Sequence, residues 1–460
     1  MLRRVWRLSM VEPIAKRSVW LIVFAAVLVL AAILYFSRDR LLHCAIAYRV
    51  YHAHIFTPPP PSPGESRFHR IQSDAQFYWD FAEIHIAREK RLQQVDPVLR
   101  PLVKQITLAQ ADGQDMHYSM HIYREIRWLL NFTSNLNATW SGVTALRRSL
   151  SESERQQLAT EQQPDGSWAL GINIWYLKLY YSIDLVEQCI GNPKYPLIFL
   201  DRINSPEKLK AELDSALHND FTRTGVFNRE KLDETFSALA RLLFEKTRTS
   251  CYLFHPELDQ ALRSFVDRWQ NAETGCWGQW LLDRHGRMWK MDDMAMTFHV
   301  LSDLRGQVKH LDQIAKRLLE IEGLDFPAGL RFSGHYENHL NADAVIILRY
   351  AWPTLDATTR ERARREISRM LAWCLSKSLQ TDGSFKPSDL DDTTSDAYEY
   401  GVWFLDEVGY FNKQKRFWTD QEFPNAQAVR SRIAGKLKAT GLADPSLKGT
   451  YDILDGIGPL

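Results

Sequence analysis

The chain has 460 residues, a formal net charge of +1 and 45% hydrophobic residues. This length is enough for a large buried core and about two or three domains. The near-zero charge excludes the basic field that attracts nucleic acid, so no nucleic-acid partner is predicted. The 15 Trp, 17 Tyr and 22 Phe residues favour a protein with an apolar or sugar-binding cavity.

The first predicted element is a membrane anchor. Residues 18–36, SVWLIVFAAVLVLAAILYF, form an uninterrupted apolar run that is long enough to cross a bilayer. Basic residues dominate residues 1–17, which predicts a cytoplasmic N-terminal tail and a main domain on the periplasmic or extracytoplasmic side. No small-residue cleavage site follows, so we expect a single-pass membrane protein rather than a cleaved signal peptide. A buried core helix is the alternative.

A proline-rich linker is predicted after the anchor. Residues 56–66, FTPPPPSPGES, contain five prolines. Such a segment cannot continue a helix and favours an extended spacer. We therefore place the boundary between the membrane segment and the main domain here.

The main domain, residues 68–460, has a helical apolar period and lacks convincing strand alternation. Glycine turns recur in it about every 54 residues, a spacing that holds two helices and their connections. These glycines are Gly113, Gly166, Gly225, Gly275, Gly334 and Gly383, all but the first followed two residues later by an aromatic residue. We predict an all-α domain in which six helical hairpins close into an (α/α)6 toroid, with an open helical array as the alternative.

Three of these turns resemble the QW repeats of squalene–hopene cyclases and other terpenoid cyclases of the α-toroid superfamily. The matching residues are Gln163, Gly166 and Trp168, then Gln270, Gly275 and Trp277, then Gln380, Gly383 and Phe385. The sequence DLDDTT at residues 389–394 is similar to the D-x-D-D-T motif of the same enzymes. The resemblance covers roughly residues 110–410 and implies a cyclase that starts its reaction by protonating an isoprenoid. It departs from the family in two ways, because the third turn ends in Phe and the chain is long enough for only one helical barrel.

By this resemblance Asp391 is the proton donor, and Asp389 and Asp392 are its partners. Protonating an alkene requires a neutral acid, and carboxyl groups packed together cannot all ionise. Tyr398 and Trp403 on the following helix are predicted to bind the substrate, because aromatic faces stabilise a cation. The alternative is an ordinary acidic helix start, where Asp side chains meet free N–H groups.

Acidic residues also open other predicted inner helices. Asp292 and Asp293 precede a helix that carries His299 about two turns in, and all three are predicted to bind the substrate. Asp233 and Asp343 are placed similarly on two further helices. In a toroid these helix starts share one mouth, so the acidic groups are predicted to converge there. Helix caps would produce the same pattern without any catalysis.

Metal ligands and cysteines give weak signals. His117 and His121 are spaced to share one helical face, which suits a metal pair, but wall or surface histidines are the alternative. The five cysteines contain no C-x-x-C pair and predict neither a zinc cluster nor a disulfide framework. No metal and no cofactor is predicted.

Three functions stay open. The first is a membrane-anchored, terpenoid-cyclase-like enzyme whose partners are the membrane and a lipid or isoprenoid substrate. The second is an exported (α/α)6 lyase or hydrolase that binds a glycan between two carboxyl groups about 5–10 Å apart, with Asp292 or Asp293 opposite Asp391 or Asp392. The third is a non-catalytic anchored scaffold that binds a protein or a lipid.

Overall fold

The structure is a computed structural model that describes most of the chain from residue 40 onward. The described residues are 40–61, 63–109, 162–168, 175–188, 193–225, 229–244, 251–332, 334–388, 394–442 and 447–456. The predicted tail and anchor therefore lie outside them. None of the described helices combines the length and the apolar composition that a bilayer crossing requires.

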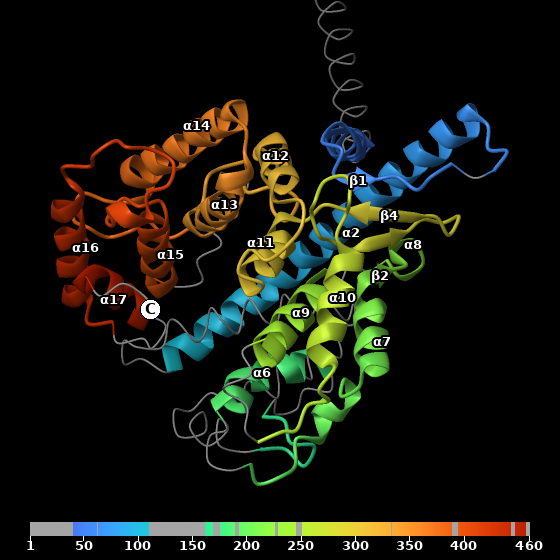
Figure 1. Cartoon of the computed structure of the whole chain (residues 1–460), viewed down its shortest axis with the longest axis horizontal. Helices are drawn as coiled ribbons and strands as arrows, with labels where there is room; N and C mark the ends of the chain where they lie inside the picture. Colours follow the sequence, from blue (N-terminus) through green and yellow to red (C-terminus); the bar gives the residue numbers. More distant parts are fainter. Residues whose placement is uncertain are drawn as a thin grey trace, which may run out of the picture.

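Helices dominate the described residues, as the sequence predicts, and they form two layers (Figure 1). The inner helices are α6 (Trp175–Gln188), α9 (Arg229–Phe244), α11 (Met294–Asp303), α13 (Asn338–Ala351), α15 (Thr394–Glu407) and α17 (Lys448–Asp455). Each packs against the next in this order. The outer helices α7 (Pro206–Leu217), α10 (Leu258–Trp269), α12 (Leu311–Ile321), α14 (Ala357–Trp373) and α16 (Ala426–Thr440) lie between them along the chain.

The inner helices form an arc. From the start of α6 at residue 175 to the start of α17 at residue 448 there are five intervals, which gives an average of about 55 residues and agrees with the expected hairpin period. Among the described elements, α17 and α6 share no extensive packing contact. The described part of the chain therefore shows layered helical hairpins but not a closed ring.

Local sequence explains the ends and the buried faces of these helices. Ser205 accepts a hydrogen bond from the backbone N–H of Lys208 and precedes Pro206, a favourable start for α7. Ile314 and Leu318, four residues apart, present one buried stripe of α12 to α13. The main hydrophobic core lies between the two layers.

A small sheet departs from the predicted all-helical fold. Its order is β1 (Phe56–Thr57), β4 (Met288–Met291), β3 (Trp280–Leu282) and β2 (His218–Asn219). β1 and β3 are both antiparallel to β4, whereas β2 is parallel to β3. The mostly helical class is confirmed, and this small sheet was not predicted, because strands of two to four residues are too short to show alternation.

A second hydrophobic core joins the N-terminal part to this sheet. Helix α2 (Arg67–Ala109) is one continuous helix of 43 residues. Its Phe77 stacks on Trp289 of β4 with ring centroids 4.0 Å apart. Phe56 is buried in the same core, so the predicted linker of residues 56–66 begins inside the folded unit rather than as a free spacer.

The glycine turns fall into two kinds. Gly166, Gly275 and Gly383 have φ angles of 86°, 77° and 93°, which favour glycine. A Cβ atom at these positions would lie 2.2, 2.9 and 2.5 Å from a backbone carbonyl oxygen on a neighbouring segment. Those carbonyls belong to Pro196, His310 and Arg432. Gly225 and Gly334 also have positive φ angles, but a Cβ atom there would meet nothing within 4 Å. Among the five predicted glycine turns that the structure describes, the close-packed kind therefore alternates with the open kind.

Glutamine side chains fix two of these turns. Gln162, and not the predicted Gln163, donates hydrogen bonds of 2.9 and 2.8 Å to its own turn and to a carbonyl before the next outer segment. Gln270 makes the same pair of bonds, both of 2.8 Å. Gln380 instead donates to carbonyls just before itself. At the first turn the bridging glutamine is therefore one residue earlier than predicted. At the third turn Gln380 does not link its turn to the next outer segment in this way.

One cysteine contradicts the prediction of no disulfide framework. Cys251 is disulfide-bonded, with its partner outside the described residues. Cys44, Cys276 and Cys374 are free. The spacing of cysteines cannot reveal such a bond, because it depends on which segments the fold brings together.

Candidate active site

The inner helices carry a hydrogen-bonded acid–imidazole pair. Asp233 lies one turn into α9, and His299 lies at a similar depth in α11. Asp233 Oδ1 and His299 Nδ1 are 2.7 Å apart. Burial lowers the pKa of His299, but Asp233 outweighs it and raises that pKa to about 10. Burial alone would raise the pKa of Asp233, but His299 and then Arg229 hold it below its ordinary value. The pair is therefore a carboxylate and an imidazolium at neutral pH.

Asp293 is linked to this pair through Arg229. Arg229 donates from Nε to Asp293 Oδ2 (2.6 Å) and from Nη2 to Asp233 Oδ2 (3.1 Å). Asp293 also caps α11 by accepting from the backbone N–H of Met296 at 3.0 Å. Asp293 is fully buried, and these bonds show that it positions Arg229 and α11. Its predicted role in substrate binding stays a prediction.

Asp343 on α13 is a buried acid with one long ion-pair contact, 4.0 Å between its Oδ2 and His339 Nε2. Its side chain is 3% exposed, and Oδ1 has no hydrogen-bond partner in the described part of the chain. Burial raises the pKa of Asp343 well above its ordinary value; His299 opposes the shift, while Glu337 and Asp233 add to it. Asp343 is therefore the acid of this region whose surroundings favour the protonated form, with the charge of His299 opposing that effect.

Aromatic rings surround the accessible side of these acids. His339, one turn before Asp343, stacks on Tyr400 of α15 with ring centroids 4.2 Å apart and an interplanar angle of 3°. Trp403 lies 6.4 Å from the same imidazole and 6.2 Å from Phe298. The side chains of His299 and His339 are 35% and 33% exposed. The two imidazoles are therefore more accessible to solvent than Asp233 and Asp343, whose side chains are 6% and 3% exposed.

These residues define the inner-face cluster. Its members come from four consecutive inner helices: Asp233, His299, His339, Asp343, Tyr400 and Trp403. Sequence reasoning selected His299 and Trp403 but not His339 or Arg229. The four-residue spacing of His339 and Asp343 was the available signal, because it places both side chains on one face of α13.

Tyr398 lies elsewhere on α15. It is fully buried and packs edge-on against Phe385 at 5.8 Å. It therefore supports the turn that precedes α15 and does not join the inner-face cluster. A helix cannot present Tyr398 and Tyr400 to the same side, since they are two positions apart.

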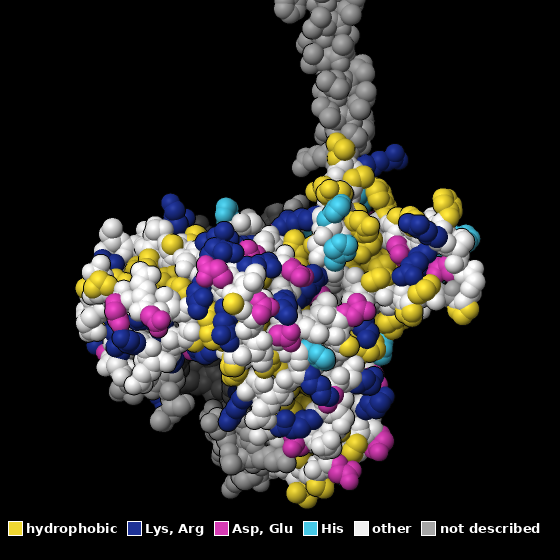
Figure 2. All heavy atoms as spheres, turned by 45° about the horizontal axis from the view of Figure 1, so that its top comes forward, with side chains coloured by type: hydrophobic (Ala, Val, Ile, Leu, Met, Phe, Trp, Pro, Cys, Tyr) yellow, Lys and Arg dark blue, Asp and Glu magenta, His cyan; other side chains and the backbone are white. Residues whose placement is uncertain are grey.

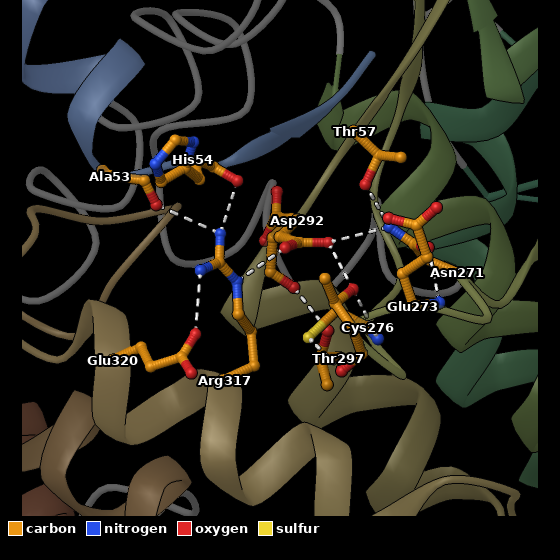
Figure 3. A network of polar contacts seen from close by, with 12 residues as sticks. Ala53, His54, Thr57, Asn271, Glu273, Cys276, Asp292, Thr297, Arg317 and Glu320 are labelled. Atoms are coloured by element: carbon orange, nitrogen blue, oxygen red, sulfur yellow. Dashed lines mark hydrogen bonds and ion pairs between the residues drawn. The ribbon is translucent and has the colours of Figure 1, made fainter. Parts of the chain in front are cut away.

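Asp292, the neighbour of Asp293, belongs to a different network (Figure 3). It accepts hydrogen bonds from Arg317 Nε (2.8 Å) and Thr274 Oγ1 (2.7 Å). The same Arg317 donates from Nη2 to the backbone carbonyl of His54 at 2.6 Å. Asp292 is fully buried, and through Arg317 it connects the N-terminal segment to α12. Its predicted role in substrate binding stays a prediction.

The remaining predicted residues lie outside the described chain. These are Asp389, Asp391, Asp392, His117 and His121. The residue before the acidic motif is described: Ser388 Oγ donates to Glu337 Oε1 at 3.2 Å. Glu337 in turn caps the start of α13, so the chain leading into the motif lies at the same helix end as the inner-face cluster.

No group of three or more His, Cys, Asp or Glu side chains with metal-binding geometry occurs within the described residues. Comparisons with protein-family models, with curated proteins and with solved structures find no match to this chain. The functional argument therefore depends on the side chains of the inner-face cluster themselves.

Proposed function

We propose that this chain is an acid–base enzyme of the terpenoid-cyclase type, which protonates an isoprenoid lipid at the inner-face cluster. The observation that carries the proposal is Asp343, a buried carboxyl group whose Oδ1 has no hydrogen-bond partner among the described residues and whose pKa is raised by burial. The order of the inner helices and their spacing support a closed (α/α)6 ring as the scaffold.

The groups of the cluster suit a protonation step. Asp343 would transfer its proton to one carbon of a C=C bond, forming a C–H bond and leaving a carbocation and a carboxylate. The His299 imidazolium would stabilise that carboxylate as it forms. The faces of Tyr400 and Trp403 would stabilise the cation. A second C=C bond would then attack the cation and close a ring, and transfer of a proton from carbon to the Asp343 carboxylate would give a neutral product and restore the acid.

Two residues compete for the role of donor. Asp391 is the donor implied by the resemblance to terpenoid cyclases, and Asp343 is the acid whose environment favours a bound proton. The bond between Ser388 and Glu337 supports a location of the acidic motif near α13. We favour Asp343, because a donor must be protonated before it can act.

The membrane location is part of the proposal. An apolar run at residues 18–36 would bring the domain to the lipid in which an isoprenoid dissolves. The disulfide at Cys251 supports a domain on the periplasmic or extracytoplasmic side, because such bonds persist in oxidising compartments. A lipid resident in the bilayer reaches that side, whereas soluble prenyl diphosphates are cytoplasmic compounds.

One observation favours a glycan enzyme as the second candidate. Asp233 and Asp343 have pKa values shifted in opposite directions, since that of the first is lowered and that of the second is raised. Glycoside hydrolysis uses two carboxyl groups that differ in this way, one as acid and one as base or nucleophile. Accessible Tyr400 and Trp403 rings would stack on sugars equally well.

The test is turnover by the purified full chain in detergent or lipid vesicles. Squalene, prenyl diphosphates and bacterial glycans would be supplied separately, and products would be identified by mass spectrometry. We expect cyclised isoprenoid from the native chain, none from Asp343→Asn, and unchanged yield from Asp382→Asn, a matched substitution of an exposed acid paired with Lys436. Loss of product in Asp391→Asn but not in Asp343→Asn would transfer the donor role to Asp391. Cleavage of a glycan instead would establish the second candidate.

A further inference from the structure

Exposed hydrophobic side chains concentrate in one short part of the chain. Among the side chains that the structure describes, nine large hydrophobic ones are exposed, and six of them lie between residues 41 and 71. These six are Leu41, Leu42, Tyr48, Tyr51, Phe68 and Ile71. Figure 2 shows hydrophobic side chains gathered around the base of the N-terminal segment and over the adjoining lobe. Phe68 is 76% exposed, an unfavourable arrangement for an aromatic side chain in water.

The six side chains lie on two helical segments that pack together. Helical residues 40–52 contact α2 about three turns from its start. His43 stacks near Trp79 at 5.3 Å, and Tyr51 meets Tyr78 edge-on at 5.3 Å. The packed residues face the second hydrophobic core, which leaves the opposite sides of both segments exposed. We call this exposed face the membrane-proximal surface.

The chain segment that carries this surface is basic. Residues 40–71 contain four arginines and one glutamate, a net charge of +3, whereas the whole chain has +1. Arg40 and Arg67 are exposed. Arg49 and Arg70 make surface ion pairs with Asp325 and Asp74 at 3.1 and 3.8 Å. Tyrosine, phenylalanine and arginine at one face are the composition of proteins that lie in the headgroup region of anionic membranes.

We propose that the membrane-proximal surface is seated in the headgroup layer of an anionic bilayer. The apolar run of residues 18–36 ends four residues before Arg40, so the surface begins where that run would leave the membrane. A bilayer fits better than a protein partner, because the arginines flank the apolar side chains on both segments and match phosphate headgroups. The domain is therefore held flat against the membrane and does not hang from a flexible linker.

The proposal can be tested by labelling single cysteines introduced at chosen positions. Cys44 is the exposed free thiol among the described cysteines, while Cys276 and Cys374 are buried. Cys44→Ser removes that thiol, and Ile71→Cys introduces one on α2, far along the chain from the apolar run. Leu253→Cys serves as the matched control, because Leu253 is 90% exposed but lies outside the surface.

The full chain carrying an environment-sensitive fluorophore at either new cysteine would be reconstituted in phosphatidylcholine–phosphatidylglycerol vesicles. We expect lipids with a spin label near the headgroup to remove most of the emission at residue 71 and little at residue 253, with the reverse for iodide in the water. Iodide quenching at residue 71 equal to that at residue 253 would overturn the proposal. Protection from both quenchers would also overturn it, since a second copy of the chain would then cover the surface. Neither readout depends on enzymatic activity.

Discussion

Asp233 and His299 form a partly buried ion pair between neighbouring inner helices, with 2.7 Å between Oδ1 and Nδ1. The pair couples helix packing to charge, because His299 keeps its proton only while α9 holds Asp233 against it. The signs of the two pKa shifts follow from this. The raised pKa of His299 stabilises the fold below its ordinary value of 6.5, and the stabilisation is lost as pH rises through about 10.

The first prediction concerns that pair. The lowered pKa of Asp233 stabilises the fold above its ordinary value of 3.8 and ceases to do so as pH falls through the shifted value. We therefore expect Asp233→Asn to cost about 1–3 kcal/mol of unfolding free energy at neutral pH, less than a fully buried pair because His299 is partly exposed. Urea unfolding at several pH values would measure it. A cost that stays constant up to pH values well above about 10 would contradict the pairing.

The second prediction concerns Asp343. Its raised pKa means that ionisation is unfavourable in the folded state, so its contribution to stability is full below 3.8 and is lost as pH rises through the shifted value. Asp343→Asn keeps the shape of the neutral acid but has no proton to give. We expect stability at neutral pH to change by less than about 1 kcal/mol, while turnover falls about 100-fold or more. A proportional loss of both would indicate a purely structural residue.

The third prediction concerns the junction of Asp292 and Arg317. Arg317→Met leaves a fully buried carboxylate without its 2.8 Å partner and releases the carbonyl of His54. We expect a cost of about 3–5 kcal/mol, measured by thermal or urea unfolding. The matched control is Lys309→Met, which breaks an exposed ion pair with Asp267 and should cost less than about 1 kcal/mol. Adding Asp292→Asn to Arg317→Met should recover part of the loss.

The fourth prediction names the disulfide partner of Cys251. Three of the five cysteines are free, so elimination leaves Cys189. A non-reduced proteolytic digest should contain a peptide linking the two residues. A loop of this length predicts a loss of about 4 kcal/mol in the Cys251→Ser variant. Two free thiols at these positions in protein from the native membrane would remove the support that the bond gives to an extracytoplasmic domain.

The sequence contains the helical layers but not the details of the site. Glycine turns and a helical period predict hairpins of about the observed spacing, because both signals are local. Asp292 and Asp293 are adjacent in the chain and equally acidic, yet one faces Arg317 and the other faces Arg229. That difference depends on which helices lie nearby. The raised pKa of Asp343 likewise arises from burial among distant residues and has no local signature.

The last prediction tests the repeated turns. Gly383 has a φ angle of 93°, and a Cβ atom there would lie 2.5 Å from the carbonyl oxygen of Arg432. Gly225 has a φ angle of 65° with open space around it. Both positions disfavour a side chain by about 1 kcal/mol through backbone strain, but only Gly383→Ala also forces the turn away from α16, at a further cost of about 1–3 kcal/mol.

Unfolding of the two alanine variants in parallel isolates the packing contribution, since the strain is common to both. Gly166→Ala should behave like Gly383→Ala, because its Cβ atom would lie 2.2 Å from the carbonyl oxygen of Pro196. If Gly225→Ala proved as destabilising as these two, close approach to the next segment would not be the reason for glycine. The match between turns that are two hairpins apart would then have no structural basis, and the support that the turns give to a repeating toroid would be lost.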